Sequence, residues 1–375
     1  MRISTLQLFN VAFVVVVAVP VVMALDASAE STAMDAIKQL GCNIERDDKL
    51  PGRPVIGVSF GGTAGKFNDG HLSLLKNFKN LKTLNLEGIP ITDTSLKELR
   101  ELNSLTTLGL DGTKITAAGL QELRPLKNLK TLTLSGIGIT DDVISELSGF
   151  KNLSTLTLSN AFATNLGLAE LAELENLTTL SVGGTGITDA ALTKLSGLKR
   201  LTTLTINAPK ITGAVVKELR ELKGLTTLHL DFTQIKDDDL KELNGLTNLT
   251  TLHLGDNQIT DAGLNELPRF TNLTTLELGE RQMTHTGLRA LKGLKKLKKL
   301  SLSRIAITND VVKAVREINS LTTLRIWGTK ITESGLTELK EFRNLMALEL
   351  QYTKITEPDL KKLKEALPKV EITSR

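Results

Sequence analysis

The sequence has little cysteine, few aromatic residues and almost no excess of charge of one sign, and each of these excludes a structural or functional class. One cysteine among 375 residues means that no disulfide within the chain can hold the fold. Aromatic residues make up only 3 %, which argues against a nucleic-acid binder built on base stacking. The 46 Lys and Arg residues barely exceed the 42 Asp and Glu residues, giving a net charge of +4. An excess of positive charge this small does not create an electrostatic potential strong enough to attract a polyanion. We therefore expect no nucleic-acid partner.

Aliphatic residues are abundant instead. Leucine alone accounts for roughly one residue in five, about twice its usual share. A disordered chain lacks that apolar mass. The length allows two or three globular domains or one elongated repeat domain, and internal repeats decide between them.

The amino end has the pattern of an export sequence. One basic residue, Arg2, precedes an apolar run from Val11 to Leu25, and Ala27-Ser28-Ala29 then offers a small-residue cleavage site. This pattern predicts a secretory signal peptide over residues 1–29. The alternative is an uncleaved anchor over residues 3–25, which is long enough to span a bilayer. Either reading places the rest of the chain outside the inner membrane, as a periplasmic or secreted protein.

The remainder of the chain is repetitive. The pattern L-x-x-L-x-L begins at Leu81 and recurs every 24 residues to Leu345, which gives twelve starts without an insertion. An irregular unit containing Val55, Val58 and Phe60 precedes them, and Val370 and Ile372 follow. Within a repeat, alternating leucines predict a short strand. The spacing then changes to every third residue, as in Leu96 and Leu99, which predicts a short helix.

The start of each predicted helix has candidate caps. Thr92-Asp93, Thr188-Asp189 and Thr260-Asp261 stand where the helices should begin. Their side-chain oxygens are of the type that caps the free N–H groups of a helix. Since one repeat cannot bury its own apolar stripe, stacking of neighbouring repeats must supply the core.

The consensus L-x-x-L-x-L-x-G-T-x-I-T-D-x-G-L-x-x-L-x-x-L resembles the 24-residue leucine-rich repeat of exported bacterial proteins. It is also similar to the cysteine-containing repeats of F-box proteins, with threonine in the cysteine position at residues 113, 185, 233, 329 and 353. No F-box region is present, so a ubiquitin-ligase role does not follow. The resemblance implies an α/β leucine-rich-repeat solenoid that is curved, with a parallel sheet on the concave face and short helices on the convex face.

Three segments are expected on this basis. They are the signal peptide at 1–29, an amino-terminal cap at 30–54 that resembles the caps of such bacterial proteins, and a solenoid at 55–375 of about 13 repeats with a truncated closing strand. Proteins of this kind bind other macromolecules, and by analogy we expect a protein partner.

The outward strand positions of the carboxy-terminal half are large or ionisable, whereas those of the first half are small and neutral. Aromatic and arginine side chains contribute much of the energy of many interfaces. The sequence therefore predicts a concave binding surface that includes His229, Asp231, Phe232, His253, Asp256, Glu277, Arg325, Trp327 and Tyr352.

Two other readings of the same face stay open. His229, His253 and Glu277 stand in one row on adjacent strands and have the donor types for a divalent metal, as a metal-dependent enzyme would need. A row of threonines suggests a glycan- or ice-binding surface; it comprises Thr83, Thr107, Thr131, Thr155, Thr179, Thr203, Thr227, Thr251, Thr275 and Thr323.

No cofactor fingerprint and no arrangement of nucleophile and base emerges from the sequence. We therefore expect an exported, non-enzymatic scaffold that binds another protein and needs no cofactor or metal. A rigid spacer without a specific ligand is the remaining alternative.

Overall fold

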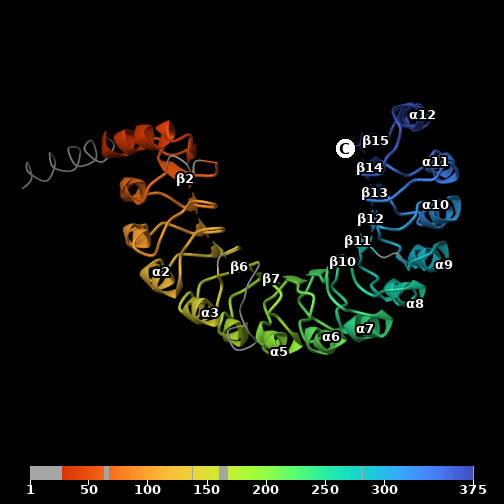
Figure 1. Ribbon diagram of the computed structural model, residues 1–375, viewed down its shortest axis with the longest axis horizontal. Coiled ribbons are helices and arrows are strands. Elements are labelled where there is room, and N and C mark those ends of the chain that lie inside the picture. The colour runs from red at the N-terminus through yellow and green to blue at the C-terminus, as the bar shows by residue number, and fades with distance from the viewer. Residues whose placement is uncertain (1–27, 63–66, 137, 160–167, 280–281, 375) are drawn as a thin grey trace, which may run out of the picture. The chain divides into compact units, whose positions relative to one another are not determined.

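The computed structural model describes residues 28–62, 67–136, 138–159, 168–279 and 282–374. The predicted anchor at 3–25 and nearly all of the predicted signal peptide lie outside these residues. Within the described ranges, no helix combines the length and the apolar character of a membrane span. The chain forms two compact units, residues 1–138 (unit 1) and 139–375 (unit 2), and both are built from the same repeat (Figure 1).

Unit 1 begins with a helix over residues 28–39 and a strand, β1, that pairs antiparallel with β2. The later strands pair in parallel, each with the next. The elements, with 3₁₀ helices labelled η, are β1 (Asn43–Arg46), β2 (Val55–Ser59), η1 (Asp69–Asn77), β3 (Thr83–Asn85), η2 (Ser95–Leu99), β4 (Thr107–Gly109), α2 (Ala117–Glu122) and β5 (Thr131–Thr133).

Unit 2 continues the alternation of strand and short helix. Its strands are β6 (Thr155–Leu158), β7 (Thr179–Gly183), β8 (Thr203–Asn207), β9 (Thr227–His229), β10 (Thr251–Gly255), β11 (Thr275–Gly279), β12 (Lys299–Ser303), β13 (Thr323–Trp327), β14 (Ala347–Gln351) and β15 (Glu371–Ser374). Its α-helices are α3 (Asp141–Leu147), α5 (Asp189–Leu192), α6 (Gly213–Leu219), α7 (Asp237–Glu242), α8 (Asp261–Leu264), α9 (His285–Leu288), α10 (Asn309–Arg316), α11 (Glu333–Leu339) and α12 (Glu357–Ala366). The 3₁₀ helices are η3 (Glu170–Glu173), η4 (Thr193–Gly197), η5 (Leu243–Gly245), η6 (Leu267–Arg269) and η7 (Arg289–Gly293).

The parallel register repeats the period of the sequence. Thr251 pairs with Thr275, and Leu252 pairs with Leu276, each one repeat further along the chain. Equivalent residues of adjacent repeats therefore lie side by side, as stacking requires. Unit 2 curves into an arc, with the strands along its inner side and the helices along its outer side (Figure 1). The predicted leucine-rich-repeat solenoid is confirmed.

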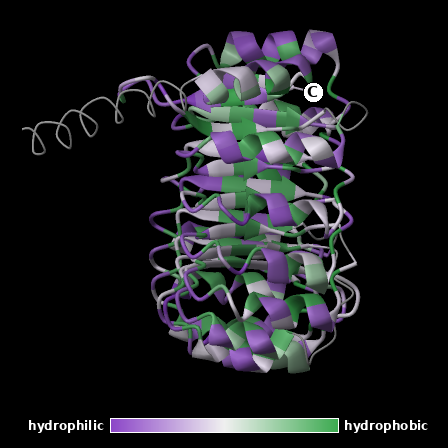
Figure 2. Cartoon of the chain, turned by 90° about the vertical axis from the view of Figure 1, so that its left-hand side faces the viewer, coloured by the Kyte–Doolittle hydropathy of each residue, from purple (hydrophilic) through white to green (hydrophobic). Residues whose placement is uncertain are grey.

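The core lies between the strands and the helices of each unit. In the repeat that begins at Leu249, the apolar side chains contribute to this core from the strand, the turn and the helix. None of them is more than 3 % exposed; they are Leu249, Leu252, Leu254, Ile259, Leu264, Leu267 and Phe270. Figure 2 shows the same arrangement as apolar segments in successive strands, with hydrophilic residues on turns and outer helices.

The Thr-Asp pairs at the helix starts act differently from the prediction. The threonine does cap its own helix in α8, where Thr260 Oγ1 accepts from Ala262 N at 3.2 Å. The aspartate instead reaches the next repeat. Asp237 Oδ1 accepts from Thr260 N at 2.8 Å, and its Oδ2 accepts from Thr260 Oγ1 at 2.7 Å. Asp93, Asp189 and Asp261 make the same pair of bonds, so this residue type joins adjacent repeats.

Candidate functional site

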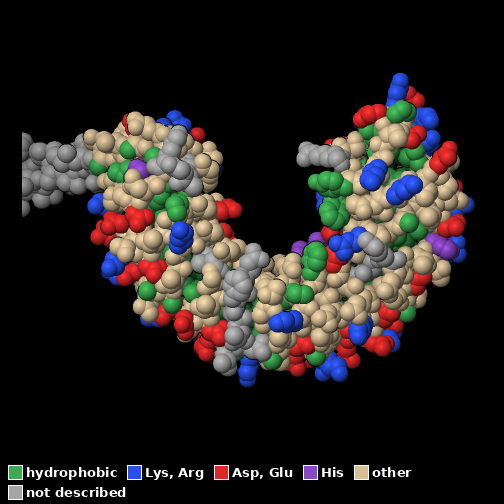
Figure 3. Space-filling model, in the orientation of Figure 1, with side chains coloured by type: hydrophobic (Ala, Val, Ile, Leu, Met, Phe, Trp, Pro, Cys, Tyr) green, Lys and Arg blue, Asp and Glu red, His purple; other side chains and the backbone are tan. Residues whose placement is uncertain are grey.

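We call the outward positions of strands β9 to β14, with the described residues of the turns that follow these strands, the inner face of unit 2. Alternation along each strand creates it. In β10, Leu252 and Leu254 are fully buried, whereas the His253 side chain between them is 22 % exposed. Figure 3 shows histidine, charged and apolar side chains gathered along this inner edge. All nine predicted binding residues belong to it.

Two histidines stack at the start of the inner face. His229 on β9 and His253 on β10 have ring centroids 3.8 Å apart and planes inclined by 7°. Thr205 Oγ1 on the adjacent strand β8 lies 3.4 Å from His229 Nδ1. The parallel register places the two rings face to face, because each occupies the same position of its repeat.

Two carboxylates face the second imidazole. His253 Nδ1 lies 3.7 Å from Asp231 Oδ2 and 3.6 Å from Glu277 Oε2. Asp231 is itself held by Gly255 N, which donates to its Oδ1 at 2.7 Å. One imidazole nitrogen therefore lies within ion-pair distance of carboxylates from the repeats on either side of it.

Burial lowers the pKa of His229 below its ordinary value of 6.5. The neighbouring His253 lowers it further, and Asp231 opposes both effects. Stacked imidazoles at this separation repel each other when both are charged. The pair therefore favours a state in which His229 is neutral.

This geometry does not fit the metal alternative. Two imidazoles bind one ion when their ring nitrogens converge on a point, and parallel stacked rings direct their lone pairs along parallel planes. Among the described residues, no group of three or more His, Cys, Asp or Glu side chains has a metal-binding arrangement. The row His229, His253 and Glu277 is instead a stacked pair beside a carboxylate.

Two ion pairs lie on the inner face. Arg325 Nε donates to Glu349 Oε2 at 2.6 Å, between paired positions of β13 and β14. Arg304 forms an ion pair with Asp256, two repeats earlier. Each guanidinium group is thus paired with a carboxylate from another repeat.

An aromatic pair lies at the carboxy-terminal end of the inner face. Trp327 and Tyr352 meet edge to face, with ring centroids 6.0 Å apart and planes at 88°. They are 42 % and 70 % exposed, and Phe232 is 50 % exposed. Among the described residues, only Leu50 and Met346 are comparably exposed large apolar side chains. Three of five such side chains therefore belong to one face of one unit.

The turn that follows several of the strands has a left-handed backbone. Glycine occupies it at residues 88, 112 and 136 of unit 1, with φ between 68° and 71°. In unit 2 the same position holds Phe232, Asp256, Arg304 and Tyr352, with φ between 53° and 61°. Non-glycine residues are disfavoured there because the Cβ crowds the backbone.

Two residues besides the nine predicted ones also lie on the inner face. The outward pattern of the sequence includes Arg304, and the structure pairs it with Asp256. Gln351 pairs in register with Trp327 and follows the same outward pattern. The replacement of the consensus glycine by a large residue is the sequence feature that marks Arg304.

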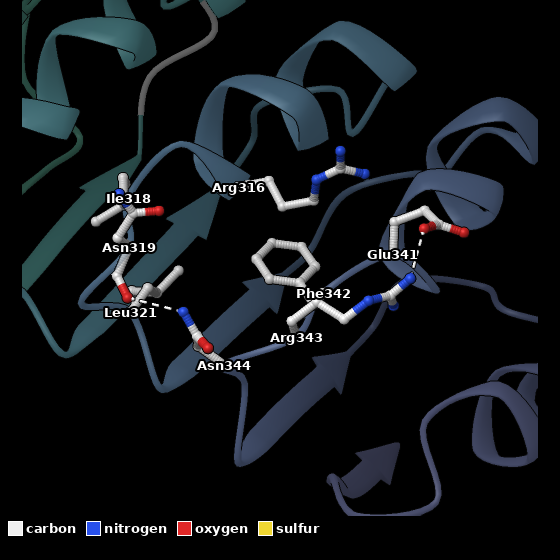
Figure 4. A pocket seen from close by; sticks show the side chains of 8 residues that line it. All are labelled: Arg316, Ile318, Asn319, Leu321, Glu341, Phe342, Arg343 and Asn344. Atoms are coloured by element: carbon white, nitrogen blue, oxygen red, sulfur yellow. Dashed lines mark hydrogen bonds and ion pairs between the residues drawn. The ribbon is translucent and has the colours of Figure 1, made fainter.

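A pocket lies away from the inner face. It encloses about 320 Å³ between α10 and the segment before β14, and is lined by Arg316, Ile318, Asn319, Leu321, Glu341, Phe342, Arg343 and Asn344. In Figure 4, Asn344 donates to the Asn319 carbonyl at 3.1 Å, and Arg343 pairs with Glu341 at 2.9 Å. Unit 1 has a pocket at the equivalent repeat positions around Phe78 and Leu102. This pocket is therefore a feature of the repeat itself.

Comparisons with known proteins agree with this architecture. The family pattern described as "Leucine-rich repeat region" matches residues 63–312. An internalin from Listeria monocytogenes superimposes with a TM-score of 0.54 at 24 % identity, covering 87 % of this chain and 91 % of the internalin. A leucine-rich-repeat protein from Leptospira interrogans gives 0.52 at 22 % identity, covering 80 % of each chain. At these identities the likeness concerns the fold alone. A search among curated proteins finds no match.

Proposed function

Because the chain belongs to the leucine-rich-repeat proteins, a group whose solenoids commonly bind other proteins, we propose that it is an exported, non-enzymatic scaffold that binds a protein partner through the inner face of unit 2. The observation that carries the proposal is the exposure of Phe232, Trp327 and Tyr352 on that face. Trp327 and Tyr352 form one exposed aromatic pair, and Phe232 lies five repeats before Tyr352 on the same face. Large apolar side chains clustered in water commonly mark an interaction site. The ordered Arg325–Glu349 pair beside Trp327 adds polar groups of the kind found in interfaces.

Export is supported by the amino-terminal pattern and by the position of the cap. Glu30 Oε1 accepts from Val55 N at 2.7 Å, and Glu30 is the first residue after the predicted cleavage site. Removal of residues 1–29 would thus leave this bond between cap and strand intact. Amino-terminal sequencing of the mature protein should find Glu30 first, and a mature protein that begins at Met1 would favour the membrane anchor.

We further infer a relation to the cysteine-containing repeats of F-box proteins. At the position where those repeats carry cysteine, Thr113, Thr233 and Thr353 are at most 5 % exposed, whereas Thr329 is half-buried and Thr185 is exposed. Thr113 Oγ1 donates to the Leu110 carbonyl at 2.7 Å. Cysteine is also a small side chain with a weak S–H donor, so it would fill this buried position equally well.

Affinity capture tests the binding function. The mature chain is immobilised, and envelope proteins of the source organism are passed over it. We expect one or more proteins to be retained, and we expect Trp327→Ala and Arg325→Ala to reduce retention at least about tenfold. Lys364→Ala on the exposed side of α12 is the matched control. Equal retention by all variants would contradict the assignment of the inner face.

A further inference from the structure

The left-handed turns of unit 2 carry side chains that the fold does not need. Phe232 and Tyr352 have φ of 57° and 53°, whereas the same turn is made by glycine at Gly112 and Gly328, with φ of 68° and 61°. A side chain is disfavoured in this region, because its Cβ crowds the backbone. Both rings also stay at least half exposed, so little burial offsets that cost. Stability alone therefore does not account for aromatic residues in these turns.

The charges of the inner face are incompletely balanced. Arg304 is paired with Asp256, and Arg325 with Glu349. Among the described residues, Asp231 and Glu277 have no lysine or arginine within ion-pair distance, and the one basic side chain near both of them is His253. The repeats on either side of His253 thus supply two carboxylates that have no lysine or arginine partner in the described part of the chain and can attract a cation. This end of the face is complementary to a positively charged side chain.

The two features are separated by a short span of sheet. His253 lies on β10, and the aromatic pair lies on β13 and just after β14. Three to four strand spacings of about 4.8 Å place them about 14–19 Å apart. An extended polypeptide advances about 3.3 Å per residue, so about five residues cover this distance.

We propose that the occupant of the inner face is an extended polypeptide segment of the partner. It presents a lysine or arginine side chain to Asp231 and Glu277, and an aromatic or large aliphatic side chain, about five residues away, to Trp327 and Tyr352. The segment crosses the strands of unit 2, because the two anchoring sites lie on different strands. This identification of the partner's chemistry rests on the proposed binding function.

Selection from a displayed library of random peptides of about ten residues tests the proposal on the full chain. The enriched peptides should combine a basic residue with an aromatic or large aliphatic residue about five positions away. A synthetic copy of an enriched peptide, followed by fluorescence anisotropy, should bind at least about tenfold more weakly to Glu277→Gln and to Trp327→Ala. Its affinity should also fall as ionic strength rises. Glu365→Gln, an exposed carboxylate on α12, is the control and should bind normally.

Tyr352→Gly keeps the test independent of folding. Glycine suits the left-handed turn at this position, so the urea midpoint of unfolding should stay the same or rise while peptide affinity falls at least about tenfold. Enriched peptides without a basic residue, no enrichment at all, or affinities unchanged in Glu277→Gln and Tyr352→Gly would overturn the proposal. If a captured protein partner is still lost with Trp327→Ala in any of these cases, the binding function stands and only the partner's chemistry is wrong.

Discussion

Replacing Gly119 by alanine should destabilise unit 1, although alanine is the better helix former. Gly119 lies in α2, and a Cβ built there would overlap Asp93 Oδ1 of the preceding repeat. Asp93 accepts two hydrogen bonds from Thr116, from N at 2.7 Å and from Oγ1 at 2.6 Å. The alanine methyl group must therefore displace the carboxylate that joins the two repeats.

The magnitude follows from opposing contributions. Alanine in place of glycine stabilises a helix by about 1 kcal/mol. A hydrogen bond to a charged group contributes about 1.5–3 kcal/mol, and these bonds are exposed enough to lie at the lower end. Loss of both bonds therefore costs about 3 kcal/mol. The net destabilisation expected for Gly119→Ala is about 2 kcal/mol.

Urea unfolding followed by far-ultraviolet circular dichroism is the appropriate assay. The only tryptophan, Trp327, lies in unit 2, so its fluorescence would not report on unit 1. In an Asp93→Ala background the carboxylate is absent, and Gly119→Ala should then be neutral or stabilising. Gly197→Ala is the matched control, because a Cβ at Gly197 meets nothing within 4 Å. A Gly119→Ala chain as stable as the parent, or equally destabilised with and without Asp93, would refute the reasoning.

Other expectations concern unit 2. The buried Asn257 amide accepts from Ile235 N at 3.2 Å and donates to the Leu230 carbonyl at 2.8 Å. Asn257→Leu leaves both partners unpaired, and each unpaired buried polar group costs about 1–3 kcal/mol. The free energy of unfolding from urea titrations should therefore fall by about 2–4 kcal/mol. The lowered pKa of His229 means that the unfolded state takes up a proton first as pH falls through 6.5, so stability should decrease from there through the lower folded pKa. His229→Gln should reduce the difference between urea midpoints at about pH 7.5 and about pH 5.5, and an unchanged difference would contradict it. Phe232→Gly should leave the midpoint unchanged or raise it, because φ of 57° suits glycine; a clear loss of stability would show that the ring supports the fold.

The turns of unit 2 contain features that the sequence predicts and features that it does not. Phe232 and Tyr352 can be predicted to face outward, because strand alternation fixes the side of the sheet. In the sequence, the only sign of their left-handed backbone is that other repeats have glycine at the same position. The conformational cost of an aromatic residue there is established only by the φ angles of the structure. Similarly, Asp93 stands at a predicted helix start, yet its bonding partner is Thr116 of the next repeat. Local pattern predicts a cap, whereas stacking offers the carboxylate a better pair of donors.

The regular spacing of the leucines determined the fold, because a fixed period forces equivalent residues into register and buries the same positions in every repeat. It also determined which residues share the inner face. Tertiary structure decided how those residues meet. The stacking of His229 on His253, the two carboxylates at His253 and the pairing of Arg304 with Asp256 across two repeats depend on side-chain rotamers and on the exact separation of strands, and neither is encoded in a one-dimensional period.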